Sequence, residues 1–215
     1  MIVGGVAGVW GNLARSDTDG WGTVTISGGN IDVSNSLSDG STKTCQVTGG
    51  TFNKDFSRYV TGGRSMVLNA DGRWQICRAK GTYWTAFDTP TGQIKVILNG
   101  TLKGPDDNLT ADATALKMND IRNALGVDAN HRFAKVSAAA GTKFVGDLSN
   151  VFAYQNIATL DLSKVDTSQM FDMTAMFAHV YADSIDLSNF NTSNVVTMQD
   201  MFNDCTNTLL KLNFA

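Results

Sequence analysis

The carboxy-terminal third of the chain repeats one pattern of apolar and polar positions every 25 residues. Residues 160–184 read LDLSKVDTSQMFDMTAMFAHVYADS, and residues 185–209 read IDLSNFNTSNVVTMQDMFNDCTNTL. In each unit an alternating Leu/Ile-Asp-Leu-Ser segment predicts a short strand. A Thr-Ser pair followed by apolar residues at i, i+3, i+6 and i+7 predicts a capped helical turn. Neither element closes a core alone, so the pattern predicts units stacked as a parallel strand ladder backed by short helices.

The same apolar frame extends one step towards the amino terminus. Apolar residues at 145–152 fall in the frame of 170–177, which predicts a degenerate unit at 135–159. We expect the inward positions of all units to form one repeat core. These positions are Leu148, Val151, Phe152, Leu160, Leu162, Met170, Met173, Met176, Phe177, Ile185, Leu187, Val195, Met198, Met201 and Phe202.

A further strand pattern begins at residue 210, where the chain reads LKLNFA. Leu210, Leu212 and Phe214 supply another apolar strand face, without the Thr-Ser segment that follows it in the other units. A bare apolar end of a stack binds a partner or aggregates. We therefore predict an assembly edge here, covered by another chain or by the amino-terminal domain.

The amino-terminal half has strand patterns separated by turn residues. Gly28-Gly29-Asn30 separates two apolar-polar alternating segments and predicts a hairpin between 21–27 and 31–33. Asp71-Gly72 suits a two-residue type I′ turn between 66–70 and 73–79, and a third pair surrounds 88–92. Strands at this spacing predict an antiparallel β-sandwich or barrel.

Composition changes near Gly104-Pro105. Eighteen of the 21 glycines and all four tryptophans lie before this point, where the net charge is +3, and the remainder carries −6. We predict a mainly β chain with short helices in three parts: a β-rich domain at 1–104, a linker at 105–134 and the repeat at 135–215. Within the linker, Asn119 as a cap and Gly126 as a terminator predict a short amphipathic helix.

The overall charge argues against two classes of partner. Lys and Arg number 17 and the acids 20, for a net charge of −3. This is too little for an electrostatic grip on nucleic acid or on an anionic membrane. No segment approaches the ~18 apolar residues of a membrane span, and no leader pattern opens the chain, so we expect no membrane insertion.

The sequence shows no complete catalytic or metal-binding motif, and we predict no enzyme, metal or cofactor. Asp17-Thr18-Asp19-Gly20 lacks the later ligands of a calcium loop, and the glycines of 5–11 follow no strand. His131 and His179 stand in no catalytic spacing, and the three cysteines form no CxxC pair. Asp161 and Asp186 should lie on adjacent strands, but their recurrence indicates a scaffold position.

The repeat pattern L-D-L-S-x-[V/F]-[D/N]-T-S-x-[M/V]-x-x-M-x-x-M-F resembles the BspA-like leucine-rich-repeat family over residues 145–215. That family occurs on bacterial cell surfaces, in some protists and in phage genomes. The resemblance implies an adhesive or structural binding module without catalytic residues.

The segment LKMNDIRNALG at 116–126 resembles a short stretch of tail and fibre proteins of phages that infect Bacteroidales. Together the two resemblances imply a phage virion protein, a capsid decoration or fibre component located in the virion. Its expected partners are other virion proteins or further copies of itself, and a host surface glycan or protein. The alternative is a fragment of a bacterial cell-surface adhesin of the same repeat family, and a weaker one is a glycan-degrading tailspike.

Overall fold

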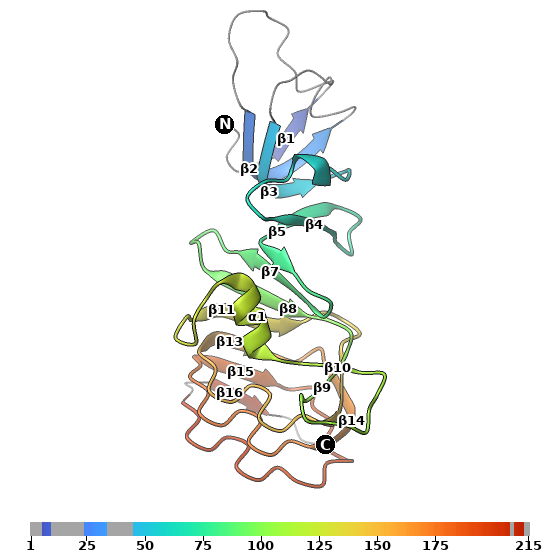
Figure 1. Ribbon diagram of the computed structural model, residues 1–215, viewed down its shortest axis with the longest axis vertical. Coiled ribbons are helices and arrows are strands. Elements are labelled where there is room, and N and C mark those ends of the chain that lie inside the picture. Colours follow the sequence, from blue (N-terminus) through green and yellow to red (C-terminus); the bar gives the residue numbers. More distant parts are fainter. Residues whose placement is uncertain (1–5, 10–23, 34–44, 207–208, 213–215) are drawn as a thin grey trace, which may run out of the picture. The chain divides into compact units, whose positions relative to one another are not determined.

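The computed structural model describes residues 6–9, 24–33, 45–206 and 209–212. The chain divides into two compact units, Met1–Ala79 and Lys80–Ala215. The described residues are mainly β, with one α-helix (Figure 1). The boundary lies well before the predicted one near Gly104, because the strands at 94–98 and 101–103 pair with strands of the repeat.

The amino-terminal unit contains a mixed five-stranded sheet with the order β1-β2-β3-β5-β4. Its elements are β1 (Val6–Val9), β2 (Val24–Val33), β3 (Cys45–Phe52), the 3-10 helix η1 (Ser57–Tyr59), β4 (Ser65–Leu68) and β5 (Trp74–Cys77). The first three strands are parallel, and β5 runs antiparallel to β3 and β4. The prediction of an antiparallel sheet is therefore wrong for β1 to β3.

The hairpin predicted at Gly28-Gly29-Asn30 is also wrong, since these residues lie inside the single strand β2. Their glycines face another glycine pair at the same level of β3. A Cβ on Gly50, whose φ is 103°, would lie 2.9 Å from the carbonyl oxygen of Gly29. These glycines allow close approach of two backbones rather than a chain reversal.

Two predicted hairpins are confirmed, but the type I′ turn expected at Asp71-Gly72 is not found. β4 pairs with β5, and β7 (Trp84–Asp88) pairs with β8 (Ile94–Leu98). In both, the N–H at the fourth turn position donates to the first carbonyl, Gly72 to Asn69 and Gly92 to Thr89. Only the glycine has a positive φ, 78° in each case. This is a three-residue type I turn followed by a glycine bulge, not a type I′ turn.

The carboxy-terminal unit holds two sheets. The larger has the order β16-β15-β13-β11-β8-β7-β6, and the smaller β10-β9-β12-β14. Their remaining strands are β6 (Ala79–Lys80), β9 (Thr101–Lys103), β10 (Thr114–Ala115), β11 (Phe133–Ala138), β12 (Lys143–Asp147), β13 (Ile157–Asp161), β14 (Asp166–Asp172), β15 (Ser184–Leu187) and β16 (Leu209–Leu212).

Successive segments of this unit lie side by side, and we call each a coil. Coil 1 spans 94–125, coil 2 spans 133–155, coil 3 spans 157–180 and coil 4 spans 184–206. Their strands pair in parallel at nearly the sequence period, as in Val136 with Leu160, Leu160 with Ile185 and Ile185 with Leu210 (Figure 1). The predicted parallel ladder, including the degenerate unit, is confirmed at this level.

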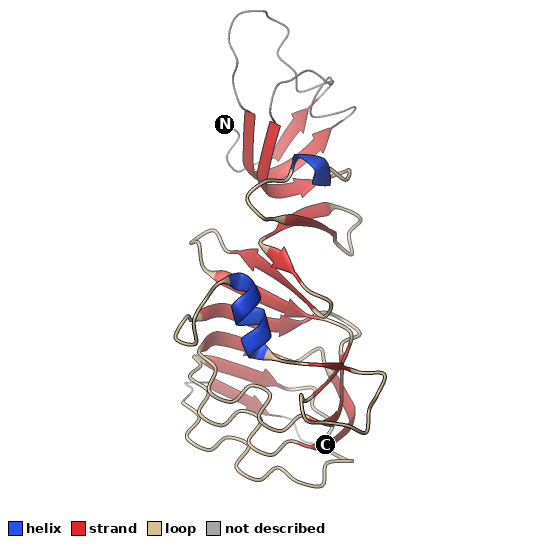
Figure 2. Ribbon diagram, viewed as in Figure 1, coloured by secondary structure: helices blue, strands red, loops and turns tan. Residues whose placement is uncertain are grey.

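The short helices predicted behind the ladder are absent from the described residues of coils 2 to 4. In their place lie the turn segments 148–155, 173–180 and 198–205, which together form what we call the turn face (Figure 2). Within 173–180, N–H groups of Met176, Ala178 and Val180 each donate to the carbonyl three residues earlier. The i, i+3 spacing of apolar residues suits these successive turns as well as it suits a helix.

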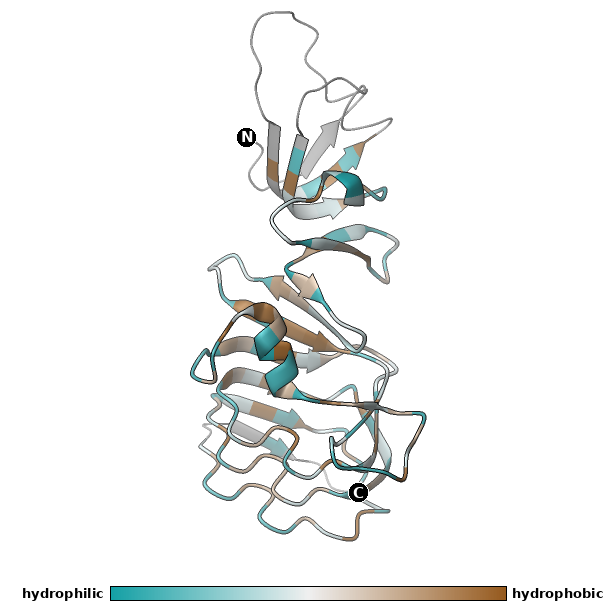
Figure 3. Cartoon of the chain, in the orientation of Figure 1, coloured by the Kyte–Doolittle hydropathy of each residue, from teal (hydrophilic) through white to brown (hydrophobic). Residues whose placement is uncertain are grey.

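The predicted helix of the linker is confirmed as α1 (Met118–Leu125), which belongs to coil 1. Gly126 ends it with a φ of 66°, whereas Lys117, not Asn119, occupies the N-cap and makes no side-chain cap bond. Ile121 and Leu125 on its apolar side are buried. Figure 3 shows hydrophilic and hydrophobic residues alternating along this helix.

Candidate binding surface

The predicted core residues of coils 2 and 3 are buried. Leu148, Val151, Phe152, Leu160, Leu162, Met170, Met173, Met176 and Phe177 all have little or no exposed area, as do Ile185, Leu187 and Met201 of coil 4. Three predicted core residues of coil 4 differ: Val195 and Phe202 are half-buried, and Met198 is 43% exposed. Met198 was expected in the core, and this expectation is wrong because no described coil lies on its outer side.

Aromatic rings form a stack through the core beneath the turn face. Phe152 and Phe177 have centroids 5.7 Å apart and Phe177 and Phe202 5.5 Å, with interplanar angles of 12° and 14°. The near-parallel rings show that equivalent residues of successive coils occupy equivalent places. The prediction from the repeat that Phe152 and Phe177 are equivalent residues is thus confirmed by their stacked rings.

The predicted assembly edge lies only partly within the described residues. β16 extends the larger sheet beside β15, with Leu210 opposite Ile185 and Leu212 opposite Leu187. The side chains of Leu210 and Leu212, and all of Phe214, lie outside the part that the structure describes. The edge therefore stays a prediction.

The turn face is held together by hydrogen bonds between coils. Alternate N–H groups of one coil donate to carbonyls of the next: Asn150 to Thr174, Phe152 to Met176 and Tyr154 to Ala178. The same ladder links Ala175, Phe177 and His179 to coil 4 at 2.8–2.9 Å. The turn face is thus a second direction of regular pairing, without regular strands.

Among the described residues, six other than glycine adopt a left-handed backbone, and all six lie at two repeating positions of this face. Asn150, Ala175 and Asp200 occupy the first, with φ of 59°, 52° and 55°, and Tyr154, His179 and Asp204 the second. Such residues cost roughly 1–3 kcal/mol each and persist only where the surrounding structure imposes the conformation. The coil-to-coil ladder imposes it here, and no glycine marked these positions in the sequence.

Aspartates and an asparagine build the corners of the coils. The carboxylates of Asp147, Asp161, Asp166, Asp172 and Asp186, and the amide oxygen of Asn191, each accept the N–H of the residue two positions on, at 2.7–3.3 Å. A side chain one carbon longer is poorly placed for this Asx turn. This explains why the acidic residues at these corners are aspartate and not glutamate.

Asp161 and Asp186 face each other on β13 and β15, as predicted, but neither is an isolated carboxylate. Lys135 contacts Asp161 at 2.7 Å, and Lys211 contacts Asp186 at 3.2 Å. Burial raises the pKa of Asp161, and hydrogen bonds from Lys135 and Ser163 outweigh this, so that its pKa lies below the usual value. For Asp186, hydrogen bonding to Ser188 is the main cause of a lowered pKa. Both are suited to a structural role.

One buried carboxylate ties the loop after β9 to coil 2. Asp107 is 4% exposed and accepts from the N–H groups of Leu109, Thr110 and Asp147 and from the Thr110 hydroxyl. Burial raises the pKa of Asp107, but these four hydrogen bonds together lower it by more, so its pKa lies below the usual value. Three backbone N–H groups and one hydroxyl hold the carboxylate in place, which suits a structural role.

Arg122 of α1 is a buried cation that sequence analysis missed. Its side chain, 3% exposed in the residue as a whole, donates to Gln155 and to the carbonyls of Asp128 and His131. Its guanidinium lies 4.5 Å from the ring centre of Phe133. Burial lowers its pKa. Arg122 therefore joins the helix of coil 1 to coil 2. The one sequence signal for its burial is that no acidic residue lies three or four positions away from it on the helix.

The other candidate residues are not brought together. His131 packs edge-on against Phe133, and His179 stacks on exposed Tyr154 with centroids 4.5 Å apart. Residues 17–20 and most of 5–11 lie outside the described residues. Within the described part, no group of three or more His, Cys, Asp or Glu side chains is placed to hold a metal ion.

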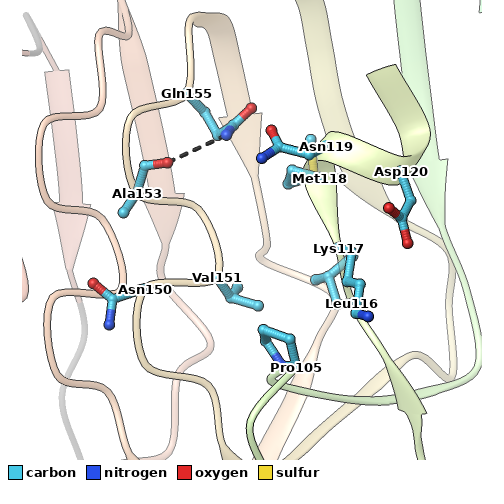
Figure 4. A pocket seen from close by; sticks show the side chains of 10 residues that line it. All are labelled: Pro105, Leu116, Lys117, Met118, Asn119, Asp120, Asn150, Val151, Ala153 and Gln155. Atoms are coloured by element: carbon cyan, nitrogen blue, oxygen red, sulfur yellow. Dashed lines mark hydrogen bonds between the residues drawn. The ribbon is translucent and has the colours of Figure 1, made fainter. Parts of the chain in front are cut away.

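A pocket of about 340 Å³ lies on the turn face between α1 and the segment 148–155. Figure 4 shows Asn150, Val151 and Ala153 on one side and the start of α1 on the other, with Gln155 and Pro105 at opposite ends. The remaining lining residues are Leu116, Lys117, Met118, Asn119 and Asp120. The pocket lies where coil 1 departs from the repeat, so the period of the sequence could not reveal it.

Residues 122–213 match the model of a family described as a Mycoplasma protein of unknown function, DUF285. The match begins within α1 and includes coils 2 to 4, and it covers less than half of the chain. Comparison with curated proteins and with solved structures finds no match. Among the described residues, no helix has the length and apolar character needed to cross a membrane.

Proposed function

We propose that this chain is a non-enzymatic structural and binding protein of a bacteriophage particle. In this proposal, coils 1 to 4 are a short leucine-rich-repeat-type solenoid that displays a binding surface, and the strand β16 is an assembly edge. The observation that carries the proposal is the double ladder of coils 2 to 4, in which strands and turn segments pair at the same spacing. Such a scaffold presents equivalent exposed positions in a row.

The side chains of the coils support a scaffold role. Corner aspartates accept backbone N–H groups, and those on the strands pair with lysines, so they are engaged in holding the coils in register. The sequence resemblances of 145–215 and 116–126 support the proposal that the protein is located in a virion. A fragment of a cell-surface adhesin remains the alternative that they also allow.

Mass spectrometry of purified particles from the source tests the placement. We expect the polypeptide at a copy number comparable with that of other capsid, tail or fibre proteins. Its absence from particles, together with its presence in a cell-surface fraction of the bacterium, would favour the adhesin.

Light scattering on the full chain tests the assembly edge. Changing Leu210 and Leu212 to Ser should lower the mass of the assembly, because burial of each leucine contributes roughly 1.5–3 kcal/mol. Lys211→Ser, on the intervening position of β16, is the matched control and should leave the mass unchanged. An unmodified chain that is monomeric at all concentrations contradicts a homo-oligomeric edge.

A further inference from the structure

The pocket beside α1 differs from the rest of the carboxy-terminal unit in how its polar side chains are used. At the coil corners, Asp and Asn oxygens accept neighbouring N–H groups. Around the pocket, the side chains of Asn119, Asn150 and Lys117 have no hydrogen-bond partner among the described residues. Two amides and an ammonium group at the surface thus line the pocket without being engaged in contacts that hold the fold together.

Asn150 stands out by comparison with its equivalents in the repeat. Ala175 and Asp200 occupy the same left-handed position in coils 3 and 4. Alanine shows that the fold accepts a side chain without polar atoms here. The fold therefore does not require an amide at this position, and Asn150 lies on the coil 2 side of the pocket, across from α1 (Figure 4).

The base of the pocket is apolar and rigid. Leu116, Met118 and Val151 are buried and contribute to its lining. Gln155, also buried, is fixed at one end because its amide oxygen accepts from Arg122 at 2.9 Å and its amide nitrogen donates to Ala153 at 3.2 Å. Binding here would not require these residues to reorganise.

The charge and size of the pocket restrict the ligand. Lys117 and Asp120 are its charged lining residues, one of each sign, so the lining carries no net charge. A volume of about 340 Å³ lies at the lower end of the roughly 300–1,000 Å³ of small-molecule sites. An amide both donates and accepts, which suits hydroxyl groups that also do both.

We propose that this pocket binds one neutral sugar ring of a surface glycan. Hydroxyl groups of the sugar bond to Asn119, Asn150 and Lys117, and its C–H face lies on Val151 and Met118. The first turn of α1, which has no side-chain cap, offers further N–H donors on its side of the pocket. The inference rests on the proposed function, since it names the ligand class of the displayed binding surface.

Nuclear magnetic resonance on the full chain, labelled with ¹⁵N, tests this directly. Glucose, galactose, mannose and N-acetylglucosamine are titrated separately, with free glutamate and free lysine as charged comparators. We expect at least one sugar to shift the amide signals of 116–120 and 150–155 saturably in the millimolar range. The two amino acids should leave these signals unchanged.

Variants identify the groups that bind. Asn150→Ala and Asn119→Ala should each weaken binding of that sugar about tenfold, since each removes a hydrogen bond to a hydroxyl group. Asp200→Ala is the matched control, because it makes a similar truncation at the equivalent left-handed position two coils away. It should leave the affinity unchanged.

Three results overturn the inference: no sugar shifts the pocket signals, only the amino acids do so, or Asn150→Ala and Asp200→Ala behave alike. None of these bears on the presence of the chain in particles. Conversely, absence from particles combined with sugar binding at the pocket overturns the virion placement and leaves the sugar site standing.

Discussion

Coils 3 and 4 carry nearly the same pattern, yet equivalent residues meet different surroundings. Met173 is fully buried in coil 3, and its equivalent Met198 is 43% exposed in coil 4. Phe177 is buried between two rings, whereas Phe202 has a described ring on one side only. Val196, next to the coil 4 turn segment, is 85% exposed. Burial in this unit is conferred by the neighbouring coil, not by the repeat pattern itself.

The backbone shows the same difference. N–H groups of Ala175, Phe177 and His179 donate to carbonyls of coil 4. Their equivalents at Asp200, Phe202 and Asp204 have no acceptor among the described residues. Within the described residues, coil 4 therefore presents both apolar side chains and a row of N–H groups without acceptors.

The largest expected effect comes from placing a charge at equivalent positions of the two coils. Met173→Asp should lower the free energy of unfolding by about 4 kcal/mol, because an unpaired buried carboxylate is poorly tolerated. Met198→Asp should cost less than about 1 kcal/mol, since its carboxylate reaches water. Urea denaturation of both variants measures this, and equal losses would mean that the two coils have the same environment.

A second prediction concerns the other end of the stack, where Asp107 ties a loop to coil 2. Asp107→Asn should cost about 2–3 kcal/mol at neutral pH, because one of the N–H groups loses its acceptor. The pKa of Asp107 is lowered on folding, so its contribution is complete above the unfolded value of about 3.9 and is lost as pH falls through the folded pKa. Urea denaturation at neutral and acid pH should show the difference between wild type and variant shrinking in acid, and a constant difference would contradict a role for the charge.

The left-handed positions of the turn face permit a test in which two similar changes have opposite effects. Ala175→Gly should leave stability unchanged or raise it by up to about 1 kcal/mol, because glycine adopts φ of 52° without strain. Ala178→Gly, three residues on and without a positive φ, should lower stability by about 0.5–1 kcal/mol. Thermal unfolding of both measures the sign, and a loss in both would show that coil 3 is not held in the left-handed conformation.

The smallest effect is expected on the strand face. Like charges on Asp161 and Asp186 alone would make Asp161→Asn neutral or stabilising, but Lys135 and Lys211 offset this repulsion. The variant should cost up to about 1 kcal/mol, since the ion pair is partly exposed and Asn retains the corner acceptor. A double-mutant cycle with Lys135→Met measures the interaction energy between Lys135 and Asp161. A coupling energy of zero would mean that Asp161 contributes only through its hydrogen bonds to Ser163.

Much of the repeat could be predicted from the sequence, because its period records equivalent positions in successive coils. Phe152, Phe177 and Phe202 were aligned by sequence alone, and their rings stack. The spacing of apolar residues could not distinguish a helix from successive turns, since both place i and i+3 on one side. Left-handed residues such as Tyr154 and His179 had no glycine to indicate them.

Strand pairing between segments that do not share the repeat pattern could not be predicted from the sequence. β8 joins the ladder through Val96 beside Val136, although coil 1 lacks the repeat motif, so the domain boundary was expected too late. The pocket was missed for the same reason: it lies between non-repeating α1 and coil 2. Gly28-Gly29 suggested a turn because local propensity cannot reveal a second glycine pair opposite it in space.

Amide hydrogen exchange on the full chain, kept monomeric by dilution, tests the coil-to-coil ladder most directly. The N–H groups of Asn150, Phe152, Ala175 and Phe177 should exchange slowly, because each is bonded to the next coil. Those of Asp200, Phe202 and Asp204 should exchange much faster, although the sequence pattern is the same. Equal protection in coils 3 and 4, or fast exchange at 150–154 and 175–179, would contradict the ladder.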